Sequence, residues 1–141
     1  MSETNGFATA ASILNGAGAR RFDERTICGQ KVRLRSITAL EYADIEATLT
    51  RSAMEARGGN KQRQVRALAD ANIALITKCV VNGEGNPVFT SEHRSQLLEM
   101  DSAFSQALAS ACMEHCGVDA ADLEQVAKNS SAVDGASSPT A

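Results

Sequence analysis

The chain has 141 residues, a length that suits one domain of ordinary size and leaves too little sequence for two. Hydrophobic residues make up 43% of the chain but aromatic residues only 4%, so the core is predicted to be aliphatic, rich in alanine and mainly helical. The formal net charge of −3 argues against nucleic-acid binding, because phosphate affinity needs a concentrated basic surface.

The N-terminal segment predicts neither a targeting signal nor a membrane span. Residues 1–6 contain no basic cluster and are expected to be disordered. Residues 7–14 can form a short helix that Gly16 and Gly18 end, and this Ala-rich stretch is too short and too weakly apolar to enter a membrane. We therefore expect a cytoplasmic protein, in which Arg20-Arg21 is an ordinary solvated face.

A β-hairpin is predicted next in the chain. Residues 21–28 and 31–37 alternate apolar and polar side chains, as strands with one buried face do. Gly29-Gln30 suits a two-residue type II′ turn between them. Because Arg25 would lie on the apolar face, a longer turn with a shifted register stays open. In the preferred register the facing pairs are Ile27 with Val32 and Glu24 with Arg35.

Two long helices are predicted after the hairpin. Thr38 and Glu41 have the spacing of a capping box, in which a hydroxyl and a carboxylate three residues later bond the first free N–H groups. That helix should run to about Ala56 and bury Tyr42, Ile45, Leu49 and Ala53. The second helix should span residues 61–79, with a solvated basic side from Lys61 to Arg66. Its apolar line is Val65, Leu68, Asn72, Leu75 or Ile76, and Cys79, and we expect the amide of Asn72 to find hydrogen-bond partners.

The third part of the chain begins with a turn. Residues 80–89 contain two glycines, two asparagines and a proline, and they predict a short extended turn segment between helices. A short helix over residues 91–100 should follow, with Leu97, Leu98 and Met100 inward. Asp101 is placed to cap the next helix and Gly117 to end it.

The sequence ends in a helix and a change of composition. The last helix should begin near Asp119 and carry Leu123 and Val126. From Asn129 onward the residues are mainly Ser, Ala, Gly and Pro, so residues 129–141 are predicted to be a disordered tail. The expected architecture is mainly α (α+β): a single helical domain over residues 7–128 with an N-terminal β-hairpin.

One cluster of chemistry-bearing residues was tested for a site. Cys112, His115 and Cys116 share one side of a predicted helix, and three such ligands could in principle reach a zinc ion. A structural zinc needs a fourth ligand, and no second Cys/His pair has the spacing to supply it. We therefore expect no metal and no disulfide between any two of the four cysteines, Cys28, Cys79, Cys112 and Cys116. Cys112 should be buried.

Catalysis is not expected either. A thiol and an imidazole held side by side on one helix lack a residue that orients the base and a group that stabilises an oxyanion. Gly83-Glu84-Gly85 lacks the preceding strand and the following Lys-Ser/Thr of a phosphate loop. We predict a protein that is not an enzyme and that has no catalytic, cofactor-binding or metal-binding residues; the partner-binding residues are not identified by the sequence.

The ordered pattern from Gln30 to Ser130 resembles the tail assembly chaperones of long non-contractile-tailed phages and prophages. The resemblance is carried by Lys31-Val32-Arg33-Leu34-Arg35-Ser36-Ile37-Thr38 with Glu41, by Cys79-Val80-Val81, by Asn82-Gly83-Glu84-Gly85-Asn86-Pro87-Val88-Phe89-Thr90, by Gly117-Val118 and by Ala127-Lys128-Asn129-Ser130. The chain departs from the family at His93-Arg94, where relatives often have more acidic residues, and at Cys116, where they often have Asn.

The resemblance implies a non-enzymatic protein of the host bacterial cytoplasm. Such a chaperone binds the tape measure protein, keeps it soluble, helps to recruit the major tail tube protein during tail morphogenesis, and is not retained in the mature virion. A homo-oligomer is possible. Two alternatives stay open: a structural tail or head–tail connector or completion protein retained in the virion, and a small DNA-binding adaptor, against which the acidic balance counts.

Overall fold

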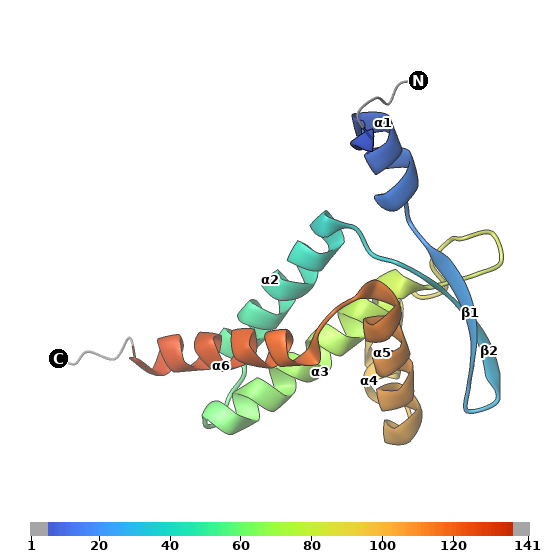
Figure 1. Cartoon of the computed structure of the whole chain (residues 1–141). Helices are drawn as coiled ribbons and strands as arrows, with labels where there is room; N and C mark the ends of the chain where they lie inside the picture. The colour runs from blue at the N-terminus through green and yellow to red at the C-terminus, as the bar shows by residue number, and fades with distance from the viewer. Residues whose placement is uncertain (1–5, 137–141) are drawn as a thin grey trace.

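The protein is mainly helical, with one small antiparallel sheet (Figure 1). The computed structural model describes the backbone of residues 6–136 and the side chains of residues 6–131. This architecture confirms the predicted fold class. The elements are α1 (Ala10–Ser12), the π-helix η2 (Ile13–Ala17), β1 (Phe22–Ile27), β2 (Gln30–Arg35), α2 (Ala39–Glu55), α3 (Asn60–Cys79), β3 (Val80–Val81), the 3₁₀ turn η3 (Ser91–His93), α4 (Arg94–Leu98), α5 (Ser102–Cys116) and α6 (Ala120–Ala136).

The hairpin is present, but its turn lies one residue earlier than predicted. Ile27 pairs with Gln30, so the two turn residues are Cys28 and Gly29. Both have positive φ, 49° and 83°, which is the pattern of a type I′ turn. The predicted register is therefore wrong by two residues: Val32 faces Arg25, and Glu24 faces Arg33.

The two-residue shift in register leaves the same side chains on the inner and outer faces of the hairpin, because side chains alternate between the faces with a period of two. Arg25 does lie on the inner face, and two carboxylates neutralise its charge there. Its guanidinium is 2.7 Å from the carboxylate of Asp23 and 2.7 Å from that of Glu114 on α5. These two ion pairs explain how an arginine is accommodated beside Val32.

The turn segment of residues 80–89 adds the third strand. Val80 pairs with Leu34 of β2, and the sheet order is β1-β2-β3. The side-chain oxygen of Asn82 accepts hydrogen bonds from the backbone N–H groups of Glu84, at 2.9 Å, and Asn86, at 3.0 Å. The loop is thus closed by its own asparagine, as turn chemistry predicts.

Arg33 fastens this loop to the sheet. Its Nη1 donates to the carbonyl of Gly83 at 2.6 Å, and its guanidinium lies 4.6 Å from the centre of the Phe22 ring. The Phe22 ring also lies against Gly85, where an added Cβ would meet it at 3.5 Å and where φ is +86°. The glycine-rich loop is therefore packed against the sheet and has a structural role.

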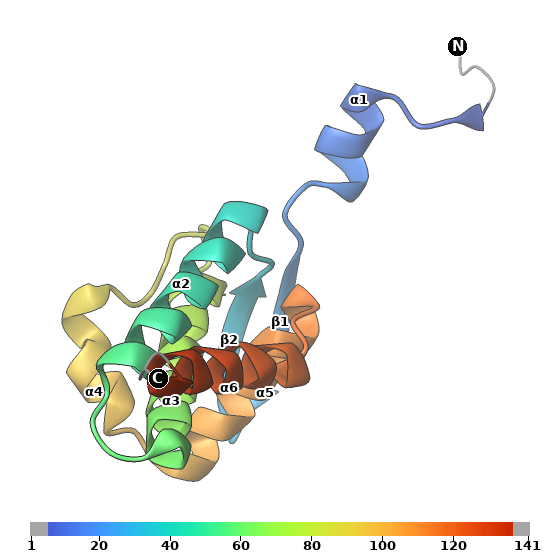
Figure 2. The same ribbon diagram turned by 90° about the vertical axis from the view of Figure 1, so that its left-hand side faces the viewer.

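Helix α3 is the central element: it packs against α2, α5 and α6, and its C-terminal end meets the sheet (Figure 2). The predicted capping box at the start of α2 is confirmed, since Thr38 and Glu41 bond each other's backbone N–H groups. Gly117 ends α5 in the left-handed conformation, also as predicted. The fully buried large side chains are Leu34, Ile45, Leu49, Leu75, Ile76, Leu108 and Leu123.

The inner face of α3 differs from the predicted one in its first half. Val65 is 58% exposed, whereas Ala67, Asp70 and Ala71 are buried. At the N-terminal end of α3 the buried face is therefore formed by other residues than the predicted apolar line. Asn72 has a buried side-chain oxygen with no hydrogen-bond partner among the residues that the structure describes, so its expected partners are not found.

Helix α6 continues past the predicted end of the domain. It extends to Ala136, and Ser131 is fully buried, so the disordered tail predicted from residue 129 is wrong for residues 129–136. Residues 137–141 of that tail, and residues 1–5 of the predicted disordered N-terminus, lie outside the described residues.

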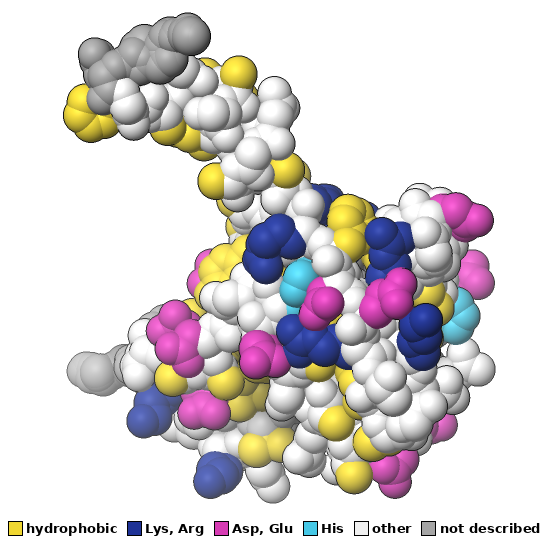
Figure 3. All heavy atoms as spheres, turned by 45° about the vertical axis from the view of Figure 1, so that its right-hand side comes forward, with side chains coloured by type: hydrophobic (Ala, Val, Ile, Leu, Met, Phe, Trp, Pro, Cys, Tyr) yellow, Lys and Arg dark blue, Asp and Glu magenta, His cyan; other side chains and the backbone are white. Residues whose placement is uncertain are grey.

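Residues 7–19 form an arm that projects from the body (Figure 2). The helix predicted over residues 7–14 starts later, at Ala10, with Thr9 as its cap, and passes into the π-helix η2. Phe7 is 80% exposed and Leu14 68% exposed. Figure 3 shows hydrophobic side chains on the surface of the projecting arm.

Candidate interaction surfaces

The Cys112–His115–Cys116 cluster belongs to the core. Cys112 is fully buried, as predicted, and His115 is 8% exposed. The Nε2–H of His115 donates to the backbone carbonyl of Arg21 at 3.0 Å, which ties α5 to the residue before β1. Cys116 places its sulfur 3.7 Å from that of Cys79.

The thiols of Cys79 and Cys116 have raised pKa values. The hydrogen bond with Cys112, together with burial, raises the pKa of Cys79 to about 12. The hydrogen bond with Cys79, and burial, also raise the pKa of Cys116. Because a thiolate is the nucleophile and the metal ligand, these environments do not favour either chemistry. Among the described residues no group of three His, Cys, Asp or Glu side chains is arranged to hold a metal ion.

The structure offers several surface hollows. One, of about 610 Å³, lies between α2 and α6 and is lined by Ala47, Met54 and Val126 among others. A second, of about 470 Å³, lies between the hairpin and the loop after β3, with Val32, Val88 and Phe89 in its walls. Both are open and largely apolar, which suits a protein partner better than a small polar substrate.

Two further hollows meet where α2 turns into α3. They measure about 820 Å³ and 390 Å³, and Ala56 and Arg66 line both of them. At the floor of the smaller one, the carboxylate of Asp70 accepts hydrogen bonds from Ser52 and Arg94, each at 2.6 Å. Sequence reasoning missed this contact, because its three residues come from α2, α3 and α4 and share no local signature.

The methionines divide between surface and core. Met54 is 50% exposed, while Met100 and Met113 are partly buried against the core. Of the three, only Met54 has its flexible apolar side chain largely exposed on the surface. No helix within the described part of the chain is long and apolar enough to cross a membrane.

Comparisons with known proteins give one informative result. No protein-family model and no curated protein sequence matches the chain. Among solved structures, the tail assembly chaperone of bacteriophage HK97 matches with a TM-score of 0.52 and 16% sequence identity. The match covers 74% of this chain and 97% of the chaperone chain. This chain therefore has the fold of a phage tail assembly chaperone.

Proposed function

We propose that this protein is a tail assembly chaperone of a phage or prophage. In this role it binds the tape measure protein, keeps it soluble in the host cytoplasm, helps to recruit the major tail tube protein, and does not remain in the virion. The observation that carries the proposal is the fold match, which accounts for almost the whole of the HK97 chaperone chain at 97% coverage.

The surface supports a binding role rather than an enzymatic one. The open apolar hollows beside α2 and beside the sheet provide area for a helical partner. The residues with catalytic potential, Cys112, His115 and Cys116, are in contrast packed in the core with raised thiol pKa values for Cys116 and its neighbour Cys79. The described part of the chain therefore presents surfaces to bind with, and the thiols of Cys79 and Cys116 are not activated as nucleophiles.

Co-expression tests the proposal. The tape measure protein of the same phage, produced with and without this chain, is expected to be soluble and to co-purify only when the chain is present. Proteomics of purified virions provides the second measurement. A chaperone is expected to be absent or sub-stoichiometric in the particles. An insoluble partner, together with a fixed, ring-like copy number of this chain in virions, would replace the proposal with the structural tail or connector alternative.

A further inference from the structure

The turn from α2 to α3 is a strongly basic surface segment of the chain. From residue 51 to residue 66 there are five Lys or Arg residues and one acidic residue, Glu55. One of the five, Arg63, has a structural role, because its guanidinium donates to the carbonyls of Ala53 and Met54 at the end of α2. The other four are exposed and form no ion pair among the described residues: Arg51, Arg57, Lys61 and Arg66.

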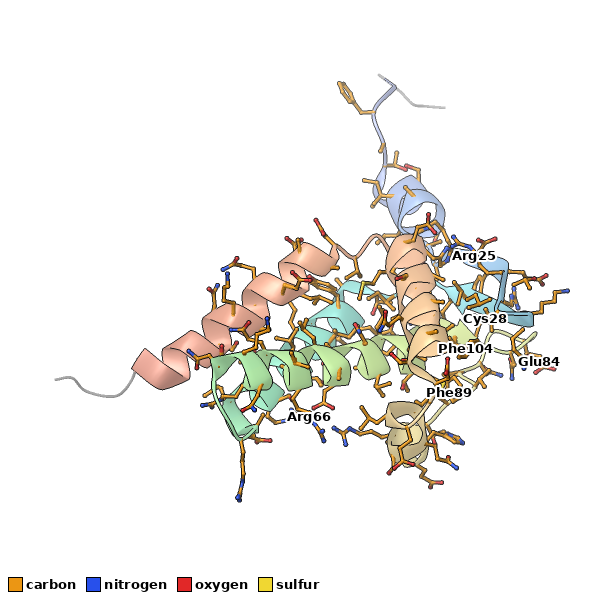
Figure 4. All side chains as sticks on the ribbon, turned by 90° about the horizontal axis from the view of Figure 1, so that it is seen from below. Arg25, Cys28, Arg66, Glu84, Phe89 and Phe104 are labelled. Carbon is orange, nitrogen blue, oxygen red and sulfur yellow. The ribbon has the colours of Figure 1, made fainter. Side chains whose placement is uncertain are left out.

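These four side chains surround the two adjoining hollows at this turn. Arg57 and Lys61 line the larger hollow, Arg51 the smaller, and Arg66 both. Figure 4 shows Arg66 pointing outward from α3, on the side where α4 lies. We call the four residues, with Arg94 and Val65, the basic turn surface.

The charge of this surface is opposite to that of the chain. Five basic and two acidic side chains line the hollows, a local charge of +3 on a chain of net charge −3. Of the acidic pair, Asp70 is already engaged by Arg94 and Ser52, and its side chain is 9% exposed. The positive charges of Arg51, Arg57, Lys61 and Arg66 are therefore left for a partner.

Apolar side chains lie between the basic ones on this surface. Val65 is 58% exposed, and Ala56 and Ala69 lie beside it in the wall of the larger hollow. A nucleic-acid backbone would pair with the basic side chains alone and would leave these apolar side chains uncovered. A helix with an acidic stripe next to an apolar one would match both features.

We propose that the basic turn surface binds an acidic amphipathic helical segment of the tape measure protein. The inference rests on the proposed function and names the surface and the chemistry of the segment. Carboxylates of the segment pair with Arg57, Lys61 and Arg66, while its apolar side chains cover Val65.

Charge reversal tests the surface. Arg66→Glu, alone and with Arg57→Glu, is compared with Arg21→Glu, an equal charge change at an exposed position that lines none of the four hollows. Both test positions are exposed, so circular dichroism is expected to show unchanged folding. The single test variant should bind the tape measure protein at least about tenfold more weakly, with a further loss in the double variant and no loss in the control. Equal binding by all variants would overturn the inference.

Zero-length carbodiimide cross-linking tests the chemistry of the partner segment. The reagent joins an amine to a carboxylate that it already contacts, so Lys61 should form an amide bond with Asp or Glu side chains of the tape measure protein. Lys61→Arg serves as the control, because it keeps the charge but has no amine to react, and it should lose these cross-links. Cross-links that persist unchanged in Lys61→Arg, or Lys61 products that map outside acidic amphipathic segments, would contradict the proposal.

The outcomes separate this inference from the proposed function. If the wild-type chain fails to bind the tape measure protein, the chaperone proposal fails with it. If the wild type binds and Arg66→Glu binds equally well, only the surface assignment fails. Two other results also overturn it: a shift in oligomeric state confined to Arg66→Glu, which would make the surface a contact between copies, or salt-sensitive binding of duplex DNA that the same change abolishes.

Discussion

Glu41 joins three parts of the fold through one carboxylate. It accepts from the N–H of Thr38 at 2.9 Å, from Arg20 at 2.9 Å, and lies 3.6 Å from Arg35. Arg35 in turn donates to the carbonyl of Lys78 near the end of α3. Burial raises the pKa of Glu41, but the Thr38 hydrogen bond and the Arg20 guanidinium outweigh it, so the pKa lies below its ordinary value.

This depressed pKa gives a pH-dependent contribution to stability. A carboxylate whose pKa is lower in the folded state stabilises that state above the unfolded value, near 4.5, and the contribution is lost as the pH falls through the folded value. Glu41→Gln should lower the free energy of unfolding at neutral pH by about 1–2 kcal/mol, through the cap and the ion pairs. Urea denaturation at a series of pH values should also show a flatter acid limb. The same flattening in Glu84→Gln, an exposed loop control, would contradict this assignment.

The four thiols should differ sharply in reactivity. Cys28 is exposed in the hairpin turn, whereas Cys79 and Cys112 are buried, and Cys116 is half-buried against Cys79. Because the pKa of Cys79 is about 12 and that of Cys116 is also raised, neither supplies thiolate at neutral pH. A disulfide reagent should modify one thiol rapidly and the other three only on unfolding. The fast phase should vanish in Cys28→Ser; a remaining fast phase would show that at least one of the other three thiols is accessible in the folded chain.

The part of helix α6 after Lys128 makes contacts that should contribute to the stability of the domain. Beyond Lys128, Ser131 is fully buried and accepts a hydrogen bond from Gln64 at 3.2 Å, and Ser130 contacts Thr50 at 3.4 Å. Deleting residues 129–141 should leave a folded domain but lower the free energy of unfolding by about 1–2 kcal/mol. Deleting only residues 137–141 removes none of these contacts and is the control. Equal stability of the two truncated chains in urea would contradict a packed end of α6.

Local signals predicted most of the elements. The capping box of Thr38 and Glu41 and the C-terminal glycine of α5 act within one helical turn, so their spacing in the sequence is sufficient. The hairpin register was not predictable in this way. A slip of two residues keeps the same face inward, and the contacts made in the observed register, Arg25 with Glu114 of α5 and Arg33 with Gly83 of the later loop, are distant in sequence.

The end of α6 and the basic turn surface were missed for related reasons. A Ser/Ala-rich segment has too little apolar area to predict burial, yet the Ser131 hydroxyl accepts from Gln64 of α3 and donates to the carbonyl of Lys128 in its own helix. The basic run from Lys61 to Arg66 was interpreted as a solvated face, because the sequence did not show that Arg51 and Arg94 lie beside it. Both features depend on which helices are neighbours.

At the scale of the whole molecule, the chain divides into a packed body and a projecting arm. The division falls at Arg20 and Arg21. Arg20 pairs with Glu41, the N–H of Arg21 donates to Ser36 at 2.7 Å, and the carbonyl of Arg21 accepts from His115. Before this junction the large apolar side chains of the arm, Phe7, Ile13 and Leu14, are all exposed.

The arm should therefore contribute nothing to the stability of the body. Among the described residues, deleting residues 1–19 removes exposed side chains only, so the free energy of unfolding should stay within about 0.5 kcal/mol of the full chain. Deleting residues 1–21 also removes the Arg20–Glu41 ion pair and the Arg21 hydrogen bonds, and it should be clearly less stable. Urea denaturation of both chains at neutral pH provides the measurement. A loss of stability already present on deletion of residues 1–19 would mean that the arm packs on the body in solution.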